Sequence, residues 1–282
     1  MKMENSEKKV WFITGASGGF GKSFAEYAIH KGYNVVITAR RLDKLENIKA
    51  IFPAQVEAIK MDVNDITEIT DAVQQAIFRF GRIDVLINNA GFGIVGAVEE
   101  TPDEELRAQL ETNFFGAAAM IRALLPTFRA QKSGAIVNIS SLGGQLSFPG
   151  FGAYSASKFA LEGLSEALAA EVSPLGIKVL IVEPGSFRTE LAGSAMKYMP
   201  EISAYKDTSG QTRNFAKEMN GTQQGDPHKA AAAIDKAINA EKTPLRLQLG
   251  EDAVKAIKLH SENLLNDLAE WEKVAVDTKI AK

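Results

Sequence analysis

The chain has 282 residues, of which 45% are hydrophobic and 24% charged, the balance of a globular protein with a sizeable core. Its formal charge of −3 excludes the basic excess that binds nucleic acid through phosphates. Without cysteine it can form neither disulfides nor thiolate metal sites, and a reducing compartment is allowed. The three histidines, His30, His228 and His260, are too scattered to form a ligand pair, so we expect no metal site.

The first residues do not have the pattern of a secretory signal. Charges at Glu4, Glu7, Lys8 and Lys9 precede only about five apolar residues, whereas a signal peptide has roughly 7–15. No stretch approaches the roughly 20 apolar residues of a membrane helix. We therefore expect a cytoplasmic protein that does not bind membranes.

Short apolar runs alternate with longer stretches of helical periodicity. The runs are rich in Val and Ile, apolar on both faces and bounded by Gly, Asp or Asn, which is typical of parallel strands covered on both sides. They are Val10–Thr14, Asn34–Thr38, Gln55–Met61, Asp84–Asn88, Ala135–Ser140, Lys178–Glu183 and the short Leu245–Leu249. The intervening segments of about 15–35 residues can hold crossover helices. The sequence predicts an α/β, doubly wound Rossmann domain of about seven parallel strands with helices on both faces.

The pattern loosens between residues 186 and 226, which show no clear period. A loop of this length is usually functional or mobile, and its methionines suit an apolar substrate of irregular shape. The alternative is a loop that only packs on its own core. We predict one domain over residues 1–282, with 186–226 as a substrate-binding loop or lid. Residues 227–282 then supply C-terminal helices and the last strand.

Within that last part, helical periodicity resumes at Pro227–Ala240, where the proline suits a first helical turn. Residues 251–275 are predicted to form a closing helix. Earlier in the chain, helices are expected at about 102–130 and 152–173.

A glycine-rich segment joins the first strand to a helical pattern. It reads Thr14-Gly15-Ala16-Ser17-Gly18-Gly19-Phe20-Gly21-Lys22. Such glycines allow a tight turn that brings backbone N–H groups to a pyrophosphate at a helix N-terminus. A Walker A loop is the competing interpretation, but it needs glycine where Ala16 stands. A turn without a ligand remains the other alternative.

The end of the second strand selects between the two nicotinamide dinucleotides. An acidic residue there binds the ribose 2′-hydroxyl, whereas arginine accepts a 2′-phosphate. The sequence has Arg40 and Arg41 and no acid directly at the strand end. This favours NADP(H) over NAD(H), unless the arginines are only a solvated helix start.

Tyr154 and Lys158 are four residues apart, so on a helix they share one face. A tyrosine pKa near 10 is too high for a base at neutral pH, and a nearby ammonium lowers it. Ser141 ends a strand 13 residues earlier, where its hydroxyl can bind a substrate oxygen. Taken alone, the spacing of Tyr154 and Lys158 is weak evidence for catalysis, because the same spacing also occurs in solvated pairs on helix surfaces.

The full set of motifs resembles the short-chain dehydrogenase/reductase family. These are TGASGGFG at 14–21, Asp62-Val63, Asn88-Asn89-Ala90-Gly91, Asn113 in TNFFG, Ser141, the YSASK segment at 154–158, and Pro184-Gly185 with Thr189. The likeness covers roughly residues 8–192. The end of the chain is similar to a branch akin to 17β-hydroxysteroid and retinol dehydrogenases, although a broad-range carbonyl reductase fits as well.

The resemblance implies a role for each motif residue. Tyr154 would be the acid/base, Lys158 its pKa-lowering partner and a ligand of the nicotinamide ribose, and Ser141 the group that polarises the carbonyl. Asn113 would hold a water linking Lys158 to solvent, although it could be a helix-contact residue. The cofactor contacts would come from Gly15, Ser17, Gly18, Gly19, Phe20, Gly21, Arg40, Asp62, Val63, Asn89, Ala90, Gly91, Tyr154, Lys158, Pro184, Gly185 and Thr189. Asp62 could instead be a helix N-cap.

The sequence thus predicts an NADP(H)-dependent oxidoreductase that transfers hydride to or from a small, apolar carbonyl or alcohol. A non-catalytic NADP-sensing protein and a non-redox enzyme on the same fold are the alternatives. The complete set of four catalytic residues disfavours a sensor, and the intact glycine pattern disfavours a dehalogenase. Because the helices at 102–130 and 152–173 carry many alanines and pack between subunits in relatives, a homodimer or homotetramer is expected.

Overall fold

The computed structural model describes residues 8–280, and the centre of this part is a parallel sheet of seven strands. The order across the sheet is β3-β2-β1-β4-β6-β7-β9. The strands are β1 (Val10–Thr14), β2 (Asn34–Ala39), β3 (Val56–Lys60), β4 (Val85–Asn88), β6 (Gly134–Ile139), β7 (Ile177–Pro184) and β9 (Arg246–Leu249). Each predicted strand is confirmed to within one residue at either end.

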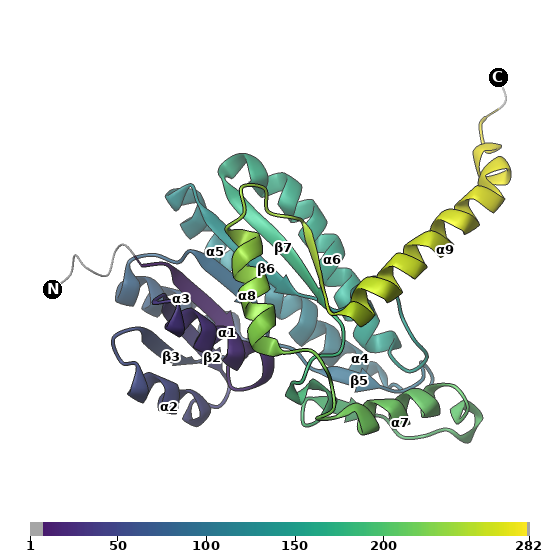
Figure 1. The fold of residues 1–282 in the computed structure, drawn as a ribbon, viewed down its shortest axis with the longest axis horizontal. Helices are drawn as coiled ribbons and strands as arrows, with labels where there is room; N and C mark the ends of the chain where they lie inside the picture. Colours follow the sequence, from purple (N-terminus) through teal and green to yellow (C-terminus); the bar gives the residue numbers. More distant parts are fainter. Residues whose placement is uncertain (1–7, 281–282) are drawn as a thin grey trace.

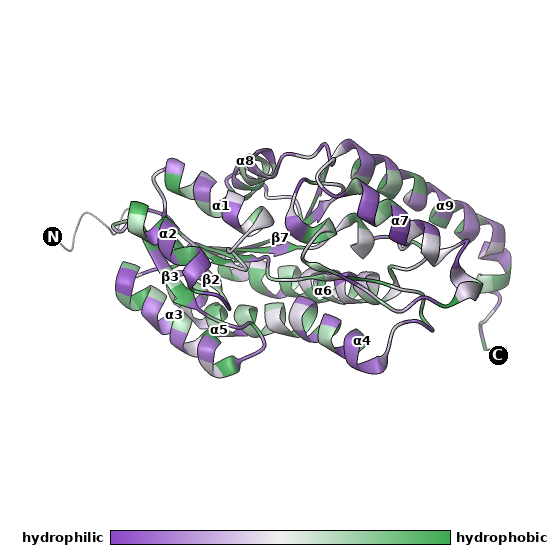
Figure 2. Ribbon diagram, turned by 90° about the horizontal axis from the view of Figure 1, so that it is seen from below, coloured by the Kyte–Doolittle hydropathy of each residue, from purple (hydrophilic) through white to green (hydrophobic). Residues whose placement is uncertain are grey.

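Helices cover both faces of this sheet, as Figure 1 and the edge-on view in Figure 2 show. On one face lie α1 (Gly19–His30), α2 (Asp43–Ile51) and α8 (Pro227–Ile238), and on the other α3 (Ile66–Phe80), α5 (Gly116–Gln131) and α6 (Gly152–Val172). Side chains of β1 alternate between two apolar cores, because successive residues of a strand point to opposite faces. Trp11 and Ile13 join the core under α1 and α8, whereas Val10 and Phe12 join the core under α3 and α5.

The predicted helix at 102–130 consists of three consecutive helical segments. A five-residue π-helical segment, Glu111–Phe115, joins α4 (Asp103–Leu110) to α5. Such wide turns are rare and recur at functional sites. This one contains Asn113, whose contacts are described below.

The segment 186–226 is more regular than the sequence suggests, and the expectation of a loop without periodicity is wrong. It contains two 3₁₀ turns (Glu190–Ala192 and Ser203–Tyr205), the strand β8 (Met196–Tyr198) and α7 (Ser209–Met219). The strand β8 pairs with β5 (Gly93–Val95), which the sequence did not predict. Hydrophobic periodicity did not predict helix α7, because its buried residues are Ser209, Arg213 and Ala216.

A buried ion pair ties α7 to the body of the protein. The Arg213 guanidinium lies 3.2 Å from a carboxylate oxygen of Glu100, and both side chains are almost fully buried. Glu100 also accepts hydrogen bonds from the backbone N–H groups of Ala97 and Ile202, and Arg213 donates to the carbonyl of Met199. Because an unpaired buried charge is costly, this pair holds α7 in place.

The helix predicted at 251–275 is confirmed as α9 (Glu251–Val276). It leaves the body and projects away from it, in yellow in Figure 1. Ala253 is its only buried residue. The periodicity that predicts this helix is therefore real, but its apolar face has no partner within the described residues.

Candidate active site

A cavity of about 1340 Å³ opens at the carboxyl ends of the strands. It reaches the point where the sheet order reverses, between β1 and β4, which is where open α/β sheets bind ligands. Every candidate residue named from the sequence lines this cavity except Gly21 and Asn113.

The glycine turn shapes one wall of the cavity. Gly15 and Gly19 have positive φ angles of 65° and 50°, which favour glycine. A Cβ at Gly21 would collide with the carbonyl of Gly15 and the amide of Asn89, although Gly21 itself does not line the wall. No side chain caps α1, so its N-terminal N–H groups have no side-chain partner at this turn. The turn therefore fits a pyrophosphate.

Thr14 and Asn89 hold this turn against the end of β4. The Thr14 hydroxyl accepts hydrogen bonds from the backbone N–H groups of Asn89 and Ala90, both at 3.0 Å. In return, the Asn89 amide donates to the carbonyls of Thr14 and Gly15 at 2.9 and 3.0 Å. Asn89 thus braces the glycine turn as well as lining the cavity.

Arg40 and Arg41 are exposed at the mouth of the cavity, together with Lys44, which the sequence reasoning did not single out. Within residues 8–280 neither arginine forms an ion pair, so both guanidinium groups are available to an anion. Asp62 lies near Arg40, after the neighbouring strand β3, and its carboxylate accepts a hydrogen bond from the backbone N–H of Asn64. Asp62 is not the helix N-cap, because Asp65 caps α3.

Tyr154 and Lys158 lie one turn apart on α6, and both are buried. The Lys158 ammonium is 5.7 Å from the centre of the Tyr154 ring and donates a 2.8 Å hydrogen bond to the carbonyl of Ile139. The pair therefore faces the end of β6 and is not a solvated surface pair.

The two adjacent serines at the end of β6 point to different partners. The hydroxyl of Ser141 accepts a hydrogen bond from the backbone N–H of Gly143, and it lies beside this glycine together with the Tyr154 ring. The hydroxyl of Ser140 donates to the buried carboxylate of Glu162. The cavity-side pair is thus Ser141 and Tyr154.

Burial shifts the pKa values of both Tyr154 and Lys158. It raises the pKa of Tyr154, and the hydrogen bond with Ser141 only partly opposes the rise. Burial lowers the pKa of Lys158 to about 8, although the charge of Glu162 acts in the opposite direction. Desolvation of the phenol is the largest cause of the Tyr154 pKa shift. The expected lowering of the Tyr154 pKa by Lys158 stays a prediction.

Asn113 lies beneath the cavity wall. Its amide oxygen accepts from the backbone N–H of Phe92, and its amide nitrogen donates to the Phe92 carbonyl and to the hydroxyl of Ser157. The side chain therefore connects the π-helical segment, the Gly91-Phe92 loop and α6. A Cβ on Gly91 would stand 3.0 Å from its oxygen.

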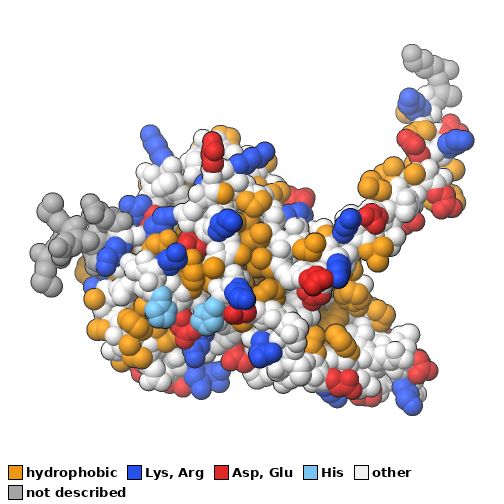
Figure 3. Space-filling view, viewed as in Figure 1, with side chains coloured by type: hydrophobic (Ala, Val, Ile, Leu, Met, Phe, Trp, Pro, Cys, Tyr) orange, Lys and Arg blue, Asp and Glu red, His pale blue; other side chains and the backbone are white. Residues whose placement is uncertain are grey.

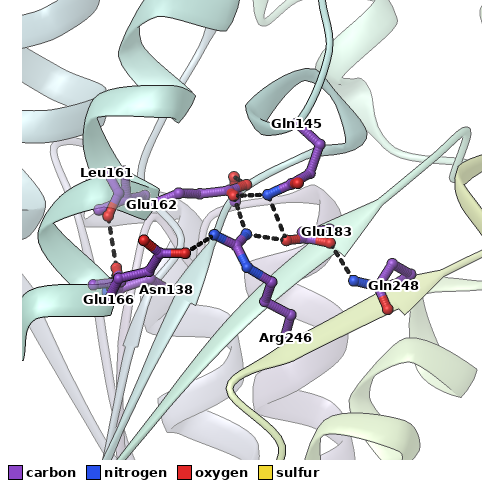
Figure 4. Close-up of polar contacts among 10 residues, drawn as sticks. Asn138, Gln145, Leu161, Glu162, Glu166, Glu183, Arg246 and Gln248 are labelled. Atoms are coloured by element: carbon purple, nitrogen blue, oxygen red, sulfur yellow. Dashed lines mark hydrogen bonds and ion pairs between the residues drawn. The ribbon is translucent and has the colours of Figure 1, made fainter. Parts of the chain in front are cut away.

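Behind the catalytic candidates lies a cluster of charges that the sequence reasoning missed (Figure 4). Glu162 on α6 and Glu183 on β7 are buried, and the guanidinium of Arg246 from β9 forms ion pairs with both. Arg246 also pairs with the more exposed Glu166 at 2.6 Å. The sequence signal that could have revealed this cluster is Glu183, a single acidic residue in the apolar run of β7.

Two glutamine side chains complete this cluster. Gln145 donates hydrogen bonds to Glu162 and Glu183, and Gln248 donates to Glu183. Burial nevertheless raises the pKa of Glu183 above its ordinary value. The cluster fixes the turn after Ser141 against α6 and the last strand.

The wide end of the cavity is mostly apolar. Its lining includes side chains that the sequence reasoning did not assign, among them Phe92, Leu142, Phe148, Phe151, Leu191 and Phe215. From the predicted methionine-rich segment, Met196 and Met219 line the cavity, whereas Met199 packs beside Ile94.

Two acidic residues at the margin were also missed. The carboxylate of Glu190 stands against Gly18, and that of Asp252 accepts a hydrogen bond from the backbone N–H of Ser186.

Residues 8–280 contain no cluster of His, Cys, Asp and Glu able to bind a metal ion. No helix in the same part of the chain is both long and apolar enough to cross a membrane.

Comparison with known proteins places the chain in a family. Residues 9–199 match the family model described as short chain dehydrogenase. The chain is 38% identical to Oxidoreductase BOA17 of Botryotinia fuckeliana over 95% of its length and 98% of the relative. It is 41% identical to 3-ketodihydrosphingosine reductase of Bacteroides thetaiotaomicron, over 86% and 88%. A crystal structure of a short-chain dehydrogenase from Streptomyces avermitilis superposes with a TM-score of 0.92 and 51% identity, covering 97% and 99% of the two chains.

Fold, motifs and similarity agree that the chain belongs to the short-chain dehydrogenase/reductase family. It is therefore an NAD(P)-dependent oxidoreductase that acts on CH–OH or carbonyl groups. Two other solved structures of this fold, 26% and 27% identical, are complexes with NADH and with NADP.

We expect Arg246→Met to destabilise the fold by about 3–5 kcal/mol at pH 7, because it leaves two buried carboxylates without their cation. Urea unfolding followed by circular dichroism measures the change. The loss should shrink toward pH 5, since a carboxyl group whose pKa is raised on folding is penalised only while it is ionised.

The matched control is Lys255→Met, which breaks an exposed ion pair with Glu251 and should leave the unfolding midpoint unchanged. An Arg246→Met protein as stable as the wild type would contradict the assignment of a stabilising buried cluster.

Proposed function

We propose that the protein is an NADP(H)-dependent carbonyl reductase or alcohol dehydrogenase for apolar substrates, with Tyr154 as the acid/base. The observation that carries this proposal is the close approach of Ser141 and Tyr154, which both lie beside Gly143, with the Lys158 ammonium 5.7 Å from the centre of the Tyr154 ring. All three side chains line one cavity with the glycine turn.

In this mechanism, the Ser141 hydroxyl donates a hydrogen bond to the substrate oxygen and orients it. Tyr154 gives its phenolic proton to that oxygen during reduction, or takes it during oxidation. The Lys158 ammonium stabilises the phenolate that forms when the proton has left. A nicotinamide held beside Pro184, Gly185 and Thr189 would supply the hydride chemistry of the reaction. Asn113 supports the reaction by connecting α6 to the Phe92 loop.

The groups that would hold the cofactor extend along the cavity from the arginines to Thr189. The glycine turn with Ser17 and Phe20 fits the pyrophosphate, and Arg40 fits a 2′-phosphate because a guanidinium pairs well with phosphate. The adenine would lie by Asp62 and Val63. Pro184, Gly185 and Thr189 would meet the carboxamide end of the nicotinamide.

The apolar lining of the wide end supports an apolar ketone or its alcohol as the substrate. The relative that is a 3-ketodihydrosphingosine reductase is consistent with such a substrate. Residues 186–226 would form the substrate-binding segment of one domain that spans 1–282. We further propose a cytoplasmic homo-oligomer, supported by the absence of cysteine and by the exposed Phe115 and Phe159 on the helices expected to pair.

Tyr154→Phe should reduce NADPH oxidation with a panel of carbonyl compounds by about 10²–10⁴-fold, because it removes the proton donor. NADPH binding, followed by nucleotide fluorescence, should persist. Tyr205→Phe, which removes a hydroxyl outside the cavity, is the control and should remain active. Equal activity of wild type and Tyr154→Phe would disprove the mechanism.

Arg40→Asp should weaken NADPH binding by about 10- to 100-fold and NADH binding much less, because only NADPH carries the 2′-phosphate. Dissociation constants for the two nucleotides test this. Arg107→Asp, exposed and outside the cavity, makes the same charge change and should affect neither. Equal losses for both nucleotides in Arg40→Asp would argue against NADP(H) selection.

Glu162→Gln should shift the pH profile of kcat/KM. The pKa of Lys158 is about 8, and the charge of Glu162 raises it. Without that charge the ammonium loses its proton at lower pH, so the alkaline fall in activity should begin at lower pH than in the wild type. Glu166→Gln, one turn along α6 and more exposed, should keep the wild-type profile. Identical profiles in all three proteins would contradict the role of Lys158.

A further inference from the structure

Helix α9 exposes a large apolar surface along its whole length. Eight large apolar side chains of this one helix are at least half exposed: Val254, Leu259, Leu264, Leu265, Leu268, Trp271, Val274 and Val276. Figure 3 shows apolar side chains along the projecting arm. Exposed apolar patches of this kind mark interaction surfaces, and a free helix gains most of its stability from packing.

One mainly apolar stripe of α9 follows a heptad repeat. Steps of three and four residues lead along one stripe: Val254, Ile257, Ser261, Leu264, Leu268, Trp271 and Ala275. This spacing places the side chains along the seam by which two helices pair. Helix α9 extends for about 39 Å at 1.5 Å per residue, enough for three heptads.

The base of α9 is firmly attached, so the helix presents this stripe in a fixed direction. Asp252 binds the backbone N–H of Ser186 at 2.7 Å, and Ala253 is fully buried. The body partly covers Ile257, but every residue of the helix from Ser261 onward is exposed, so the body leaves the rest of the stripe uncovered.

The charges on α9 favour another copy of the same helix as its partner. The helix carries six acidic residues and only three lysines, which disfavours an anionic membrane surface. Lys258 follows the stripe residue Ile257, and Glu272 follows the stripe residue Trp271, so both flank the stripe on the same side.

The direction of pairing follows from these charges. In an antiparallel pair related by a two-fold axis, Lys258 faces Glu272 of the partner subunit, and the contact occurs twice. A parallel pair would instead set Asp267 beside Glu272 of the partner subunit, which is a repulsive contact. Antiparallel pairing also keeps the two bodies at opposite ends of the helices.

We propose that α9 is a dimerisation helix that pairs antiparallel with α9 of a second copy of this chain. This interface is separate from the one expected on α4 to α6, and it does not depend on the catalytic proposal. If both interfaces exist, loss of α9 pairing halves the mass of a larger assembly.

The first test measures the mass of the full chain at micromolar concentration by light scattering after gel filtration. The double substitution Leu264→Glu/Leu268→Glu should halve the wild-type mass, because it puts four carboxylates into the seam. Asn263→Glu/Asn266→Glu adds the same charge away from the seam and should keep the wild-type mass. Wild type of one-chain mass, or a seam variant of unchanged mass, would overturn the proposal.

A charge exchange tests the direction of pairing. Lys258→Glu and Glu272→Lys should each raise the dissociation constant of the assembly roughly tenfold, because each creates like-charge contacts. The double variant restores opposite charges and should return to the wild-type value. Double-variant affinity that shows no recovery would overturn the antiparallel arrangement.

Two further measurements test whether the stripe is needed for pairing and whether α9 binds a membrane instead. A chain ending at His260 lacks most of the stripe; it should keep the melting temperature of the body and have half the wild-type mass. Flotation with vesicles of phosphatidylcholine and phosphatidylserine should leave the wild type unbound. Binding to these vesicles together with one-chain mass would show α9 to be a membrane helix and overturn the proposal.

Discussion

The attachment of β4 to the turn after β1 is the constraint on which the rest of the site depends. Both strands are buried, and the Thr14 hydroxyl and Asn89 amide lock the glycine turn to the end of β4 through four hydrogen bonds. Because the sheet order reverses at this point, the crossover helices depart to opposite faces and leave a crevice. The cavity at the strand ends is formed where these helices diverge.

Burial of Tyr154 and Lys158 disfavours their charged forms, and charged side chains nearby partly offset this effect for Lys158. Tyr154 and Lys158 are both shifted toward their neutral forms by desolvation. The carboxylate of Glu162 opposes this for Lys158, and Arg246 in turn forms ion pairs with Glu162 and Glu183. The last strand of the sheet thus contributes to the charge balance around α6, although β9 supplies no candidate catalytic residue.

The local sequence pattern was sufficient to predict the sheet and most of the residues that line the cavity. Strands buried on both faces have continuous apolar runs, and the motif residues follow strand ends, which meet at one edge in a parallel sheet. Helix α7 and the cluster around Arg246 were not predictable in this way. Their buried residues are polar, so they lack hydrophobic periodicity, and the partners of Arg213 and Arg246 are distant in sequence.

The sequence by itself determined the α/β fold, the family and the residues that meet in the cavity, because these depend on short-range patterns and fixed spacing. Only the tertiary structure decided that Asn89 braces the glycine turn, that burial raises the pKa of Tyr154, and that α9 leaves the body. Each of these depends on what surrounds a side chain in space. The heptad stripe of α9 looks the same in sequence whether it covers a core or faces outward, and only the fold shows that it faces outward.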